Sequence, residues 1–223
     1  MQPIYLDNSA TTALLPAARE KMIAAMDAYG NPSSYHRLGR EAAAMLTEAR
    51  EAIARSLGIR RLSPGELVFT SCGSEANTLA LMGVAHAKTR RTANRIVTTD
   101  SEHPAVENVM QALEREGFEI VRISTKGGAL DMEQVDKALH DRVFMVSMMM
   151  VNNETGALYD LKKVFSLART RSPGVVTHTD AVQGYLKCRF TPASLGADLV
   201  TISAHKVHGP KGVGALYINP ALL

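Results

Sequence analysis

The sequence lacks several features that would suggest particular classes of protein. It has no tryptophan, aromatic residues make up only 5% of its 223 residues, and the net charge is +3 with scattered basic residues, so we expect no nucleic-acid partner. The two cysteines, Cys72 and Cys188, form no CxxC pair or disulfide framework, which favours a reducing, cytoplasmic compartment. No apolar run approaches the roughly 20 residues of a membrane helix, and no signal segment opens the chain, so we expect no membrane association.

The sequence is instead rich in apolar residues, which make up 46% of the chain and support a sizeable folded core. Short apolar runs alternate with helical patterns through most of the chain. This alternation predicts an α/β fold with a mostly parallel sheet and helices on both sides. We expect strands at residues 66–70, 95–99, 118–124, 143–149, 175–179, 198–203 and 213–218, and helices at 104–116, at 162–171 and from residue 75.

The first 60 residues show a different pattern. Residues 4–6 suggest a short strand, and Pro16 suits the first turn of a helix that runs to about Ala28. Apolar residues then recur on one face of a long amphipathic helix at 38–57, which Gly58 ends. Further along, Asp131 followed by Gln134 resembles the capping box that starts a helix.

Polar residues cluster where the expected strands end. In open α/β sheets, ligands bind outside the carboxyl ends of the strands, so these clusters predict one shared site. The clusters are Ser71 to Ser74, His103, Asn153 with Glu154, Asp180 with Gln183, and Ser203 to Lys206.

Lys206 is the most informative of these residues. It follows an apolar strand and precedes a turn rich in glycine and proline, where Ser203 and His205 could donate hydrogen bonds to a phosphate. A lysine that loses its solvent there becomes a usable nucleophile and base. We therefore hypothesise a Schiff-base lysine that carries pyridoxal 5'-phosphate (PLP), against the alternative of a solvated turn lysine.

Two other clusters fit the same cofactor. The small residues before the helix at residue 75 leave free backbone N–H groups at its positive end, an arrangement suited to phosphate, although a helix cap without a ligand is the alternative. Asp180 ends an apolar strand, and a protonated pyridine nitrogen would supply the cation that a buried carboxylate needs. The alternative for Asp180 is a helix-capping role.

Histidines offer weaker signals. His103 lies at a strand-to-helix turn, where it could stack on a flat ring or move protons, or could be an ordinary surface residue. His178, His205 and His208 lack the spacing of known metal motifs, and we expect no metal.

Taken in order along the chain, these segments resemble the cysteine desulfurases of the NifS/IscS type, within the class V aminotransferase-like group of fold-type I PLP enzymes. The resemblance implies a three-layer α/β sandwich with a mostly parallel mixed sheet, the large domain of a PLP-dependent transferase. The similar segments are residues 5–12 (YLDNSATT), 30–34 with His36, 69–71 leading to 74–75, 102–103, 151–156 (VNNETG), 180–183 (DAVQ) and 203–212 (SAHKVHGPKG).

The resemblance also implies a role for each site residue. Lys206 would hold the cofactor and move the substrate Cα proton, and His103 would stack on the ring and assist proton transfer. Asp180 would pair with the ring nitrogen, Gln183 would bond the ring hydroxyl oxygen, and Asn153 would lie by the substrate carboxylate. The phosphate would be held by Gly73, Ser74, Ser203 and His205. The family commonly has threonine at the position of Ser74, and serine keeps the hydroxyl.

The implied reaction converts L-cysteine to alanine and an enzyme-bound persulfide, for iron–sulfur cluster or thio-cofactor assembly. Residues 1–223 would form the PLP-binding large domain, with an N-terminal arm and helix at about 1–30, and the C-terminal small domain that carries the sulfur-accepting cysteine would be absent. Cys72 lies in the predicted phosphate cradle, where the helix N-terminus could lower its pKa. Expected partners are a second copy of the chain and an iron–sulfur scaffold or sulfur-acceptor protein. Another class V activity, such as transamination, and a non-catalytic PLP-binding subunit are the alternatives.

Overall fold

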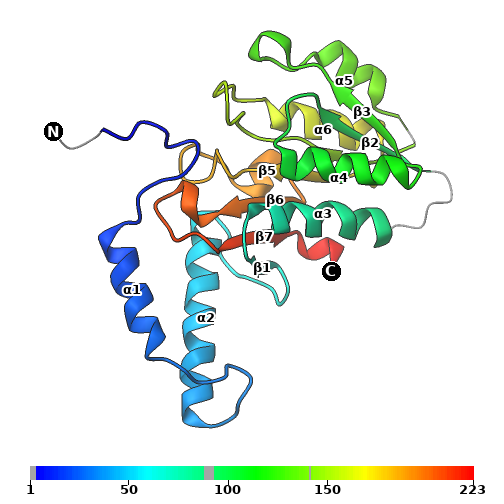
Figure 1. Ribbon diagram of the computed structural model, residues 1–223. Coiled ribbons are helices and arrows are strands. Elements are labelled where there is room, and N and C mark those ends of the chain that lie inside the picture. Colours follow the sequence, from blue (N-terminus) through cyan, green and yellow to red (C-terminus); the bar gives the residue numbers. More distant parts are fainter. Residues whose placement is uncertain (1–3, 88–92, 141) are drawn as a thin grey trace.

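The computed structural model describes residues 4–87, 93–140 and 142–223. A single mixed sheet forms its centre, in the order β1-β7-β6-β5-β4-β2-β3 (Figure 1). Its strands are β1 (Leu67–Thr70), β2 (Arg95–Thr99), β3 (Glu119–Ile123), β4 (Val143–Ser147), β5 (Val176–Asp180), β6 (Leu199–Ser203) and β7 (Gly214–Ile218).

Only β7 runs against its neighbours. It pairs antiparallel with both β1 and β6, while β3, β2, β4, β5 and β6 are parallel. Because β1 and β6 are each antiparallel to β7, all strands except β7 point their carboxyl ends toward the same edge. This edge is where the polar clusters predicted from the sequence come together.

Helices cover both faces of this sheet, as Figure 1 shows. The helices are α1 (Pro16–Met26), α2 (Arg37–Ser56), α3 (Gly73–Ala87), α4 (Pro104–Arg115), α5 (Met132–Ala138), α6 (Leu161–Arg171) and α7 (Pro192–Leu195). Short 3-10 turns complete the described elements: η1 (Lys126–Gly128), η2 (Ala204–Lys206) and η3 (Pro220–Leu222).

The strands pack side chains into apolar clusters on both faces of the sheet. Ile96 and Met145 contact α3 and α4 on one face, while Val97 and Val146 belong to the core with α5 and α6 on the other. Side chains alternate along a strand, so a strand that is apolar throughout must be covered on both faces. The predicted three-layer α/β sandwich with a mostly parallel mixed sheet is therefore confirmed.

The N-terminal part lies outside the layers. Helices α1 and α2 extend away from the sheet (Figure 1), and none of the residues of α1 is buried. Residues 5–15 return to the carboxyl edge of the sheet, where Thr12 N donates to His205 O at 2.9 Å and Leu15 N donates to His208 O at 3.0 Å. We call residues 5–15 the arm.

The structure corrects three local predictions. Residues 4–6 do not form a strand, because this exposed segment has no partner in the sheet. Helix α3 begins at Gly73 rather than at Glu75. Asp131 caps α5 by accepting hydrogen bonds from the backbone N–H groups of Glu133 and Gln134, but the Gln134 side chain accepts from Ser124 N instead of closing the capping box.

Candidate active site

All nine residues predicted for the site line one open cavity at the carboxyl edge of the sheet. The cavity has a volume of about 160 Å³. The nine are Gly73, Ser74, His103, Asn153, Asp180, Gln183, Ser203, His205 and Lys206, and their neighbours in the wall are Cys72, Asn77, Ala105, Met149, Val151 and Val182.

The N-terminus of α3 forms one wall of the cavity. A Cβ atom at Gly73 would lie 2.9 Å from Val182 Cγ2, so a larger residue at this position would require the Val182 side chain to shift. Beside Gly73, the side chain of Ser203 is buried, with a residue exposure of 2%, and its Oγ has no hydrogen-bond partner among the described residues. A buried hydroxyl without a partner is costly, and this one belongs to a residue that lines the cavity.

Cys72 lies in the same wall. A hydrogen bond from the Glu75 backbone N–H lowers the pKa of the Cys72 thiol, and hydrogen bonds from Ser71 and Ser74 add to the effect. This direction agrees with the sequence-based expectation for a thiol at a helix N-terminus. The N–H groups that stabilise a thiolate would also stabilise another anion.

Asp180 ends β5 at the bottom of the cavity, and its carboxylate is held in a fixed orientation. Oδ2 accepts a hydrogen bond from Asn77 Nδ2 at 2.7 Å, and Oδ1 accepts one from Val182 N at 2.9 Å. Burial raises the pKa of Asp180, while these hydrogen bonds and the nearby His103 and Lys206 side chains oppose the increase. An additional cation in the cavity would favour the charged carboxylate further.

His103 is the N-cap residue of α4. Its Nδ1 accepts a hydrogen bond from Ala105 N at 3.1 Å, so in the neutral ring the proton is assigned to Nε2. The capping contact fixes the ring at the rim of the cavity. The Nε2–H group is therefore the part of the ring that can reach a ligand.

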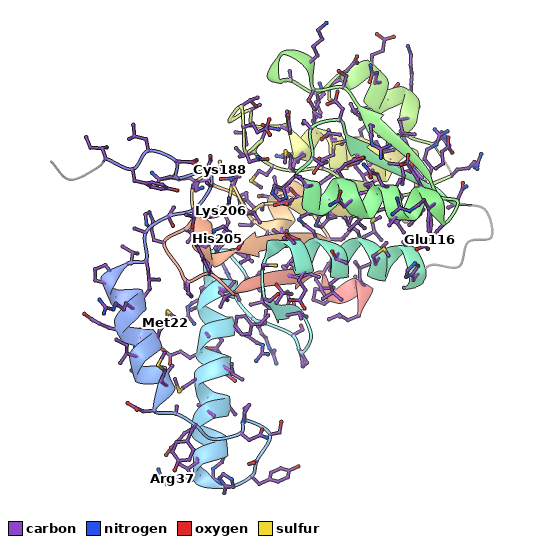
Figure 2. All side chains as sticks on the ribbon, viewed as in Figure 1. Met22, Arg37, Glu116, Cys188, His205 and Lys206 are labelled. Atoms are coloured by element: carbon purple, nitrogen blue, oxygen red, sulfur yellow. The ribbon has the colours of Figure 1, made fainter. Side chains whose placement is uncertain are left out.

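The arm contacts Lys206 directly. Lys206 follows β6 within η2, and its Nζ donates to the backbone oxygen of Ser9 and, at 2.8 Å, to that of Ala10. Partial burial lowers the pKa of Lys206, and the positive charge of Lys187 adds to this effect. Figure 2 shows Lys206 and His205 where the arm meets the sheet.

The arm also contacts Gln183 and His205, which lie beside Lys206 in the cavity wall. Gln183 Nε2 donates to Ser9 O at 2.8 Å, and Gln183 Oε1 accepts from Lys187 Nζ at 3.1 Å. His205 Nδ1 lies 3.1 Å from Thr11 Oγ1. Burial and the charges of two nearby lysines lower the pKa of His205, so the ring is held toward its neutral form.

Asn153 is carried by the loop after β4. The preceding Asn152 shapes this loop, because its Oδ1 accepts hydrogen bonds from the backbone N–H groups of Glu154 and Thr155 at 2.9 and 2.8 Å. Asn152 Nδ2 in turn donates to Ser101 O at 3.1 Å, which joins the loop to the turn that carries His103.

Sequence reasoning did not identify Asn77 or the backbone oxygens of the arm. Asn77 lies one helical turn after Gly73 on α3, and this spacing is the signal that points it toward the same wall. The three histidines considered as metal ligands have other partners: His178 is buried between Ser147 and Thr201, while His205 and His208 contact the arm. Within the described ranges, no group of three or more potential ligands could hold a metal.

Comparison with known families identifies the chain. The model of the aminotransferase class-V family matches residues 4–223. The chain belongs to this family. Among curated proteins, the chain is 41% identical over 222 residues to the cysteine desulfurase IscS of Vibrio cholerae serotype O1 (strain M66-2). It is 38% identical over 221 residues to a cysteine desulfurase of Trichormus azollae.

Solved structures with the same fold are also similar to this chain. A NifS-like protein superimposes with a TM-score of 0.92 at 36% identity, covering 98% of this chain and 60% of that one. The protein SspA, solved in complex with cysteine, superimposes with a TM-score of 0.88 at 32% identity, covering 97% and 61%. The matches to the two curated relatives cover 97% and 98% of this chain but 54% of the length of each relative. The chain therefore spans about half the length of these relatives.

Proposed function

We propose that this chain binds pyridoxal 5'-phosphate through Lys206 and carries the cofactor-dependent part of a cysteine desulfurase. The observation that carries the proposal is the convergence of Lys206, Asp180 and the unpartnered hydroxyl of Ser203 on one cavity. The similarity to proteins named cysteine desulfurase supports the same reading.

The residues present fit this cofactor on structural grounds. The orphaned Ser203 Oγ and the N–H groups at the start of α3 suit a phosphate. Asn77 Oδ1 is a second buried polar atom without a partner in the described chain, and it also belongs to a residue that lines the cavity. Asp180 provides the fixed carboxylate that a protonated ring nitrogen needs.

When bound, PLP supplies an electron sink for negative charge that develops at a substrate Cα. In this proposal, Lys206 holds the cofactor and moves the Cα proton. Asp180 keeps the ring nitrogen protonated, while Gln183 bonds the ring hydroxyl oxygen. The phosphate is held by Gly73, Ser74, Ser203 and His205.

The environment of Lys206 suits this role. A neutral amine is the nucleophilic form of lysine, and the lowered pKa of Lys206 increases its population at neutral pH. The contacts of Nζ with Ser9 O and Ala10 O must give way when the amine binds the cofactor, and Gln183 must likewise exchange Ser9 O for its new partner. The arm is therefore expected to shift when the cofactor binds.

We propose L-cysteine as the substrate, with Asn153 beside its carboxylate and the His103 ring stacked on the cofactor, assisting proton transfer through Nε2. A thiol must then accept the substrate sulfur. Cys72 lies in the phosphate wall, and the half-buried Cys188 packs against the core, so we assign sulfur acceptance to neither.

The domain organisation and the partners are parts of the same proposal. We propose that residues 1–223 form the PLP-binding large domain, that this domain works as a homodimer, and that a sulfur-acceptor protein receives the product. Exposed apolar side chains on α1, including Ile23 and Met26 with 55% and 74% exposure, support a covering partner. Sedimentation of the cofactor-loaded chain would show a dimer, and a monomer at micromolar concentration would count against this part.

Exchange of the substrate Cα proton tests the proposed function without requiring sulfur transfer. The PLP-loaded chain should incorporate deuterium at Cα of L-cysteine in heavy water, as observed by NMR, much faster than free PLP does. Lys206→Ala should abolish the gain. Exchange that proceeds equally well in Lys206→Ala would overturn the role of this lysine. In a separate assay, transfer of the amino group to a keto acid would instead favour another class-V activity.

A further inference from the structure

Glu102 joins the two segments that carry His103 and Asn153. It lies in the turn between β2 and α4, directly before His103. Its Oε1 accepts hydrogen bonds from Thr99 Oγ1 at 2.7 Å and from Met149 N at 2.9 Å. One carboxyl oxygen therefore fixes the end of β2 to the backbone of the loop that follows β4.

Two further contacts join the same segments around Glu102. Ser101 Oγ lies 3.0 Å from Tyr159 OH, and Asn152 Nδ2 donates to Ser101 O at 3.1 Å. The turn and the loop thus form one unit, with Glu102 as its central contact. Because His103 and Asn153 sit on opposite sides of this contact, a change at Glu102 alters their relative position.

The second oxygen of Glu102 has a different environment. Oε2 is buried and has no hydrogen-bond partner in the part of the chain that the structure describes. Burial raises the pKa of Glu102 to about 8, and the negative charges of Asp180 on β5 and Glu107 on α4 act in the same direction. The hydrogen bonds from Thr99 and Met149 oppose the increase. Asp100 and His103 are the other titratable groups of this turn, and Asp100 Oδ1 accepts hydrogen bonds from Thr125 N at 3.0 Å and from Thr125 Oγ1 at 2.7 Å.

We propose that Glu102 is a positioning residue that works as a neutral carboxylic acid, aligning His103 with Asn153 without placing a second negative charge beside Asp180. The neutral form is sufficient for the contacts, because an uncharged carbonyl oxygen can accept both hydrogen bonds. In the proposed site, Asp180 pairs with the protonated ring nitrogen of the cofactor. An ionised Glu102 would be a second carboxylate that competes with Asp180 for this positive charge. This inference rests on the proposed function for its catalytic meaning, although the alignment itself is a property of the cofactor-free chain.

The first test uses the free chain, so it does not depend on cofactor binding. The His103 ring resonance, assigned by comparison with His103→Gln, is followed by NMR from pH 6 to 9.5. We expect an inflection near pH 8 from the ionisation of Glu102, absent in Glu102→Gln. The control Glu107→Gln removes the neighbouring carboxylate that pairs with Arg122 at 2.9 Å, and it should keep the inflection. Persistence of the inflection in Glu102→Gln would overturn the inference.

The second test measures PLP affinity by absorbance. At pH 7, Glu102→Gln should bind PLP within about twofold of the unsubstituted chain, because the amide retains the carbonyl acceptor. Thr99→Val, which removes one donor to Oε1, should weaken binding several-fold. The unsubstituted chain should lose affinity above pH 8, and Glu102→Gln should show less of this loss. Equal weakening by Glu102→Gln and Glu102→Ala at pH 7 would mean that the ionised form is required and would refute the proposal. If no variant binds PLP at any pH, the proposed function fails while the NMR result still decides the role of Glu102.

Discussion

Substitution of Ser203 by alanine should have opposite effects on the free chain and on its affinity for the cofactor. The hydroxyl of Ser203 is buried without a partner in the described structure, and Ser203 lines the cavity beside Gly73. In the free chain it contributes only a desolvation cost. With a phosphate in the cavity it would become a hydrogen-bond donor to an anion.

Each effect has an expected size. Removing a buried, unpaired hydroxyl avoids a desolvation penalty of about 1–3 kcal/mol, so the free Ser203→Ala chain should be more stable by about 1 kcal/mol, or about 2–4 °C in Tm. A hydrogen bond to a charged group contributes about 1.5–3 kcal/mol, so the Kd for PLP should rise roughly 10- to 100-fold.

The assay compares thermal unfolding of the free chain with PLP affinity from absorbance titration. Thr179→Val is a matched control, because Thr179 Oγ1 is also buried without a partner within the described ranges but does not line the cavity. The control should stabilise the free chain to a similar extent and leave Kd unchanged. Destabilisation of the free chain by Ser203→Ala together with an unchanged Kd would refute the reasoning.

Three further predictions concern stability. Because the folded-state pKa of Glu102 is raised from its ordinary value of 4.5 to about 8, the folded chain keeps a proton that the unfolded chain loses, and stability should fall between those pH values by up to roughly 5 kcal/mol. Glu102→Gln should flatten this dependence in urea titrations, and an unchanged slope would contradict it. Leu186 has φ 57°, so Leu186→Gly should be about 0.5–1 kcal/mol more stable than Leu186→Ala in urea unfolding; an equal or lower stability would argue against strain at this turn. Thr12→Val removes the donor to His205 O and the acceptor for His208 N, and should cost about 1–2 kcal/mol in thermal unfolding; no loss would mean that the arm is not held there.

The strands of the sheet could be predicted well because each is an apolar run between polar turns. β2 occupies the predicted residues, 95–99, and the other strands differ by one or two residues at their ends. Residues 4–6 have a similar local pattern but form no strand. Pairing depends on a neighbour in space, and local sequence carries no information about that neighbour.

The part of the candidate site that lies at the carboxyl ends of the strands could be predicted from the sequence. Lys206 and His103 follow parallel strands and Asp180 ends one, so the convergence of these residues at one edge follows from the α/β pattern. The contact of Lys206 with Ser9 and Ala10 joins residues almost 200 positions apart, and no local pattern encodes it. The sequence places Glu102 next to His103, but it does not reveal that Glu102 is buried. Its burial, and hence its raised pKa, depends on the packing of the loop after β4.

The most direct test of the account is the absorbance spectrum of the chain mixed with PLP. A Schiff base with Lys206 should give a band at about 410 nm, an electronic property of the cofactor that the protein tunes. Gel filtration should not remove this band, because the cofactor would be covalently attached to the chain. The band should be lost in Lys206→Ala, while Lys187→Ala, which removes the neighbouring amine, should retain it. A chain that stays colourless with excess PLP, or a Lys206→Ala variant that keeps the band, would contradict the central claim that Lys206 holds the cofactor.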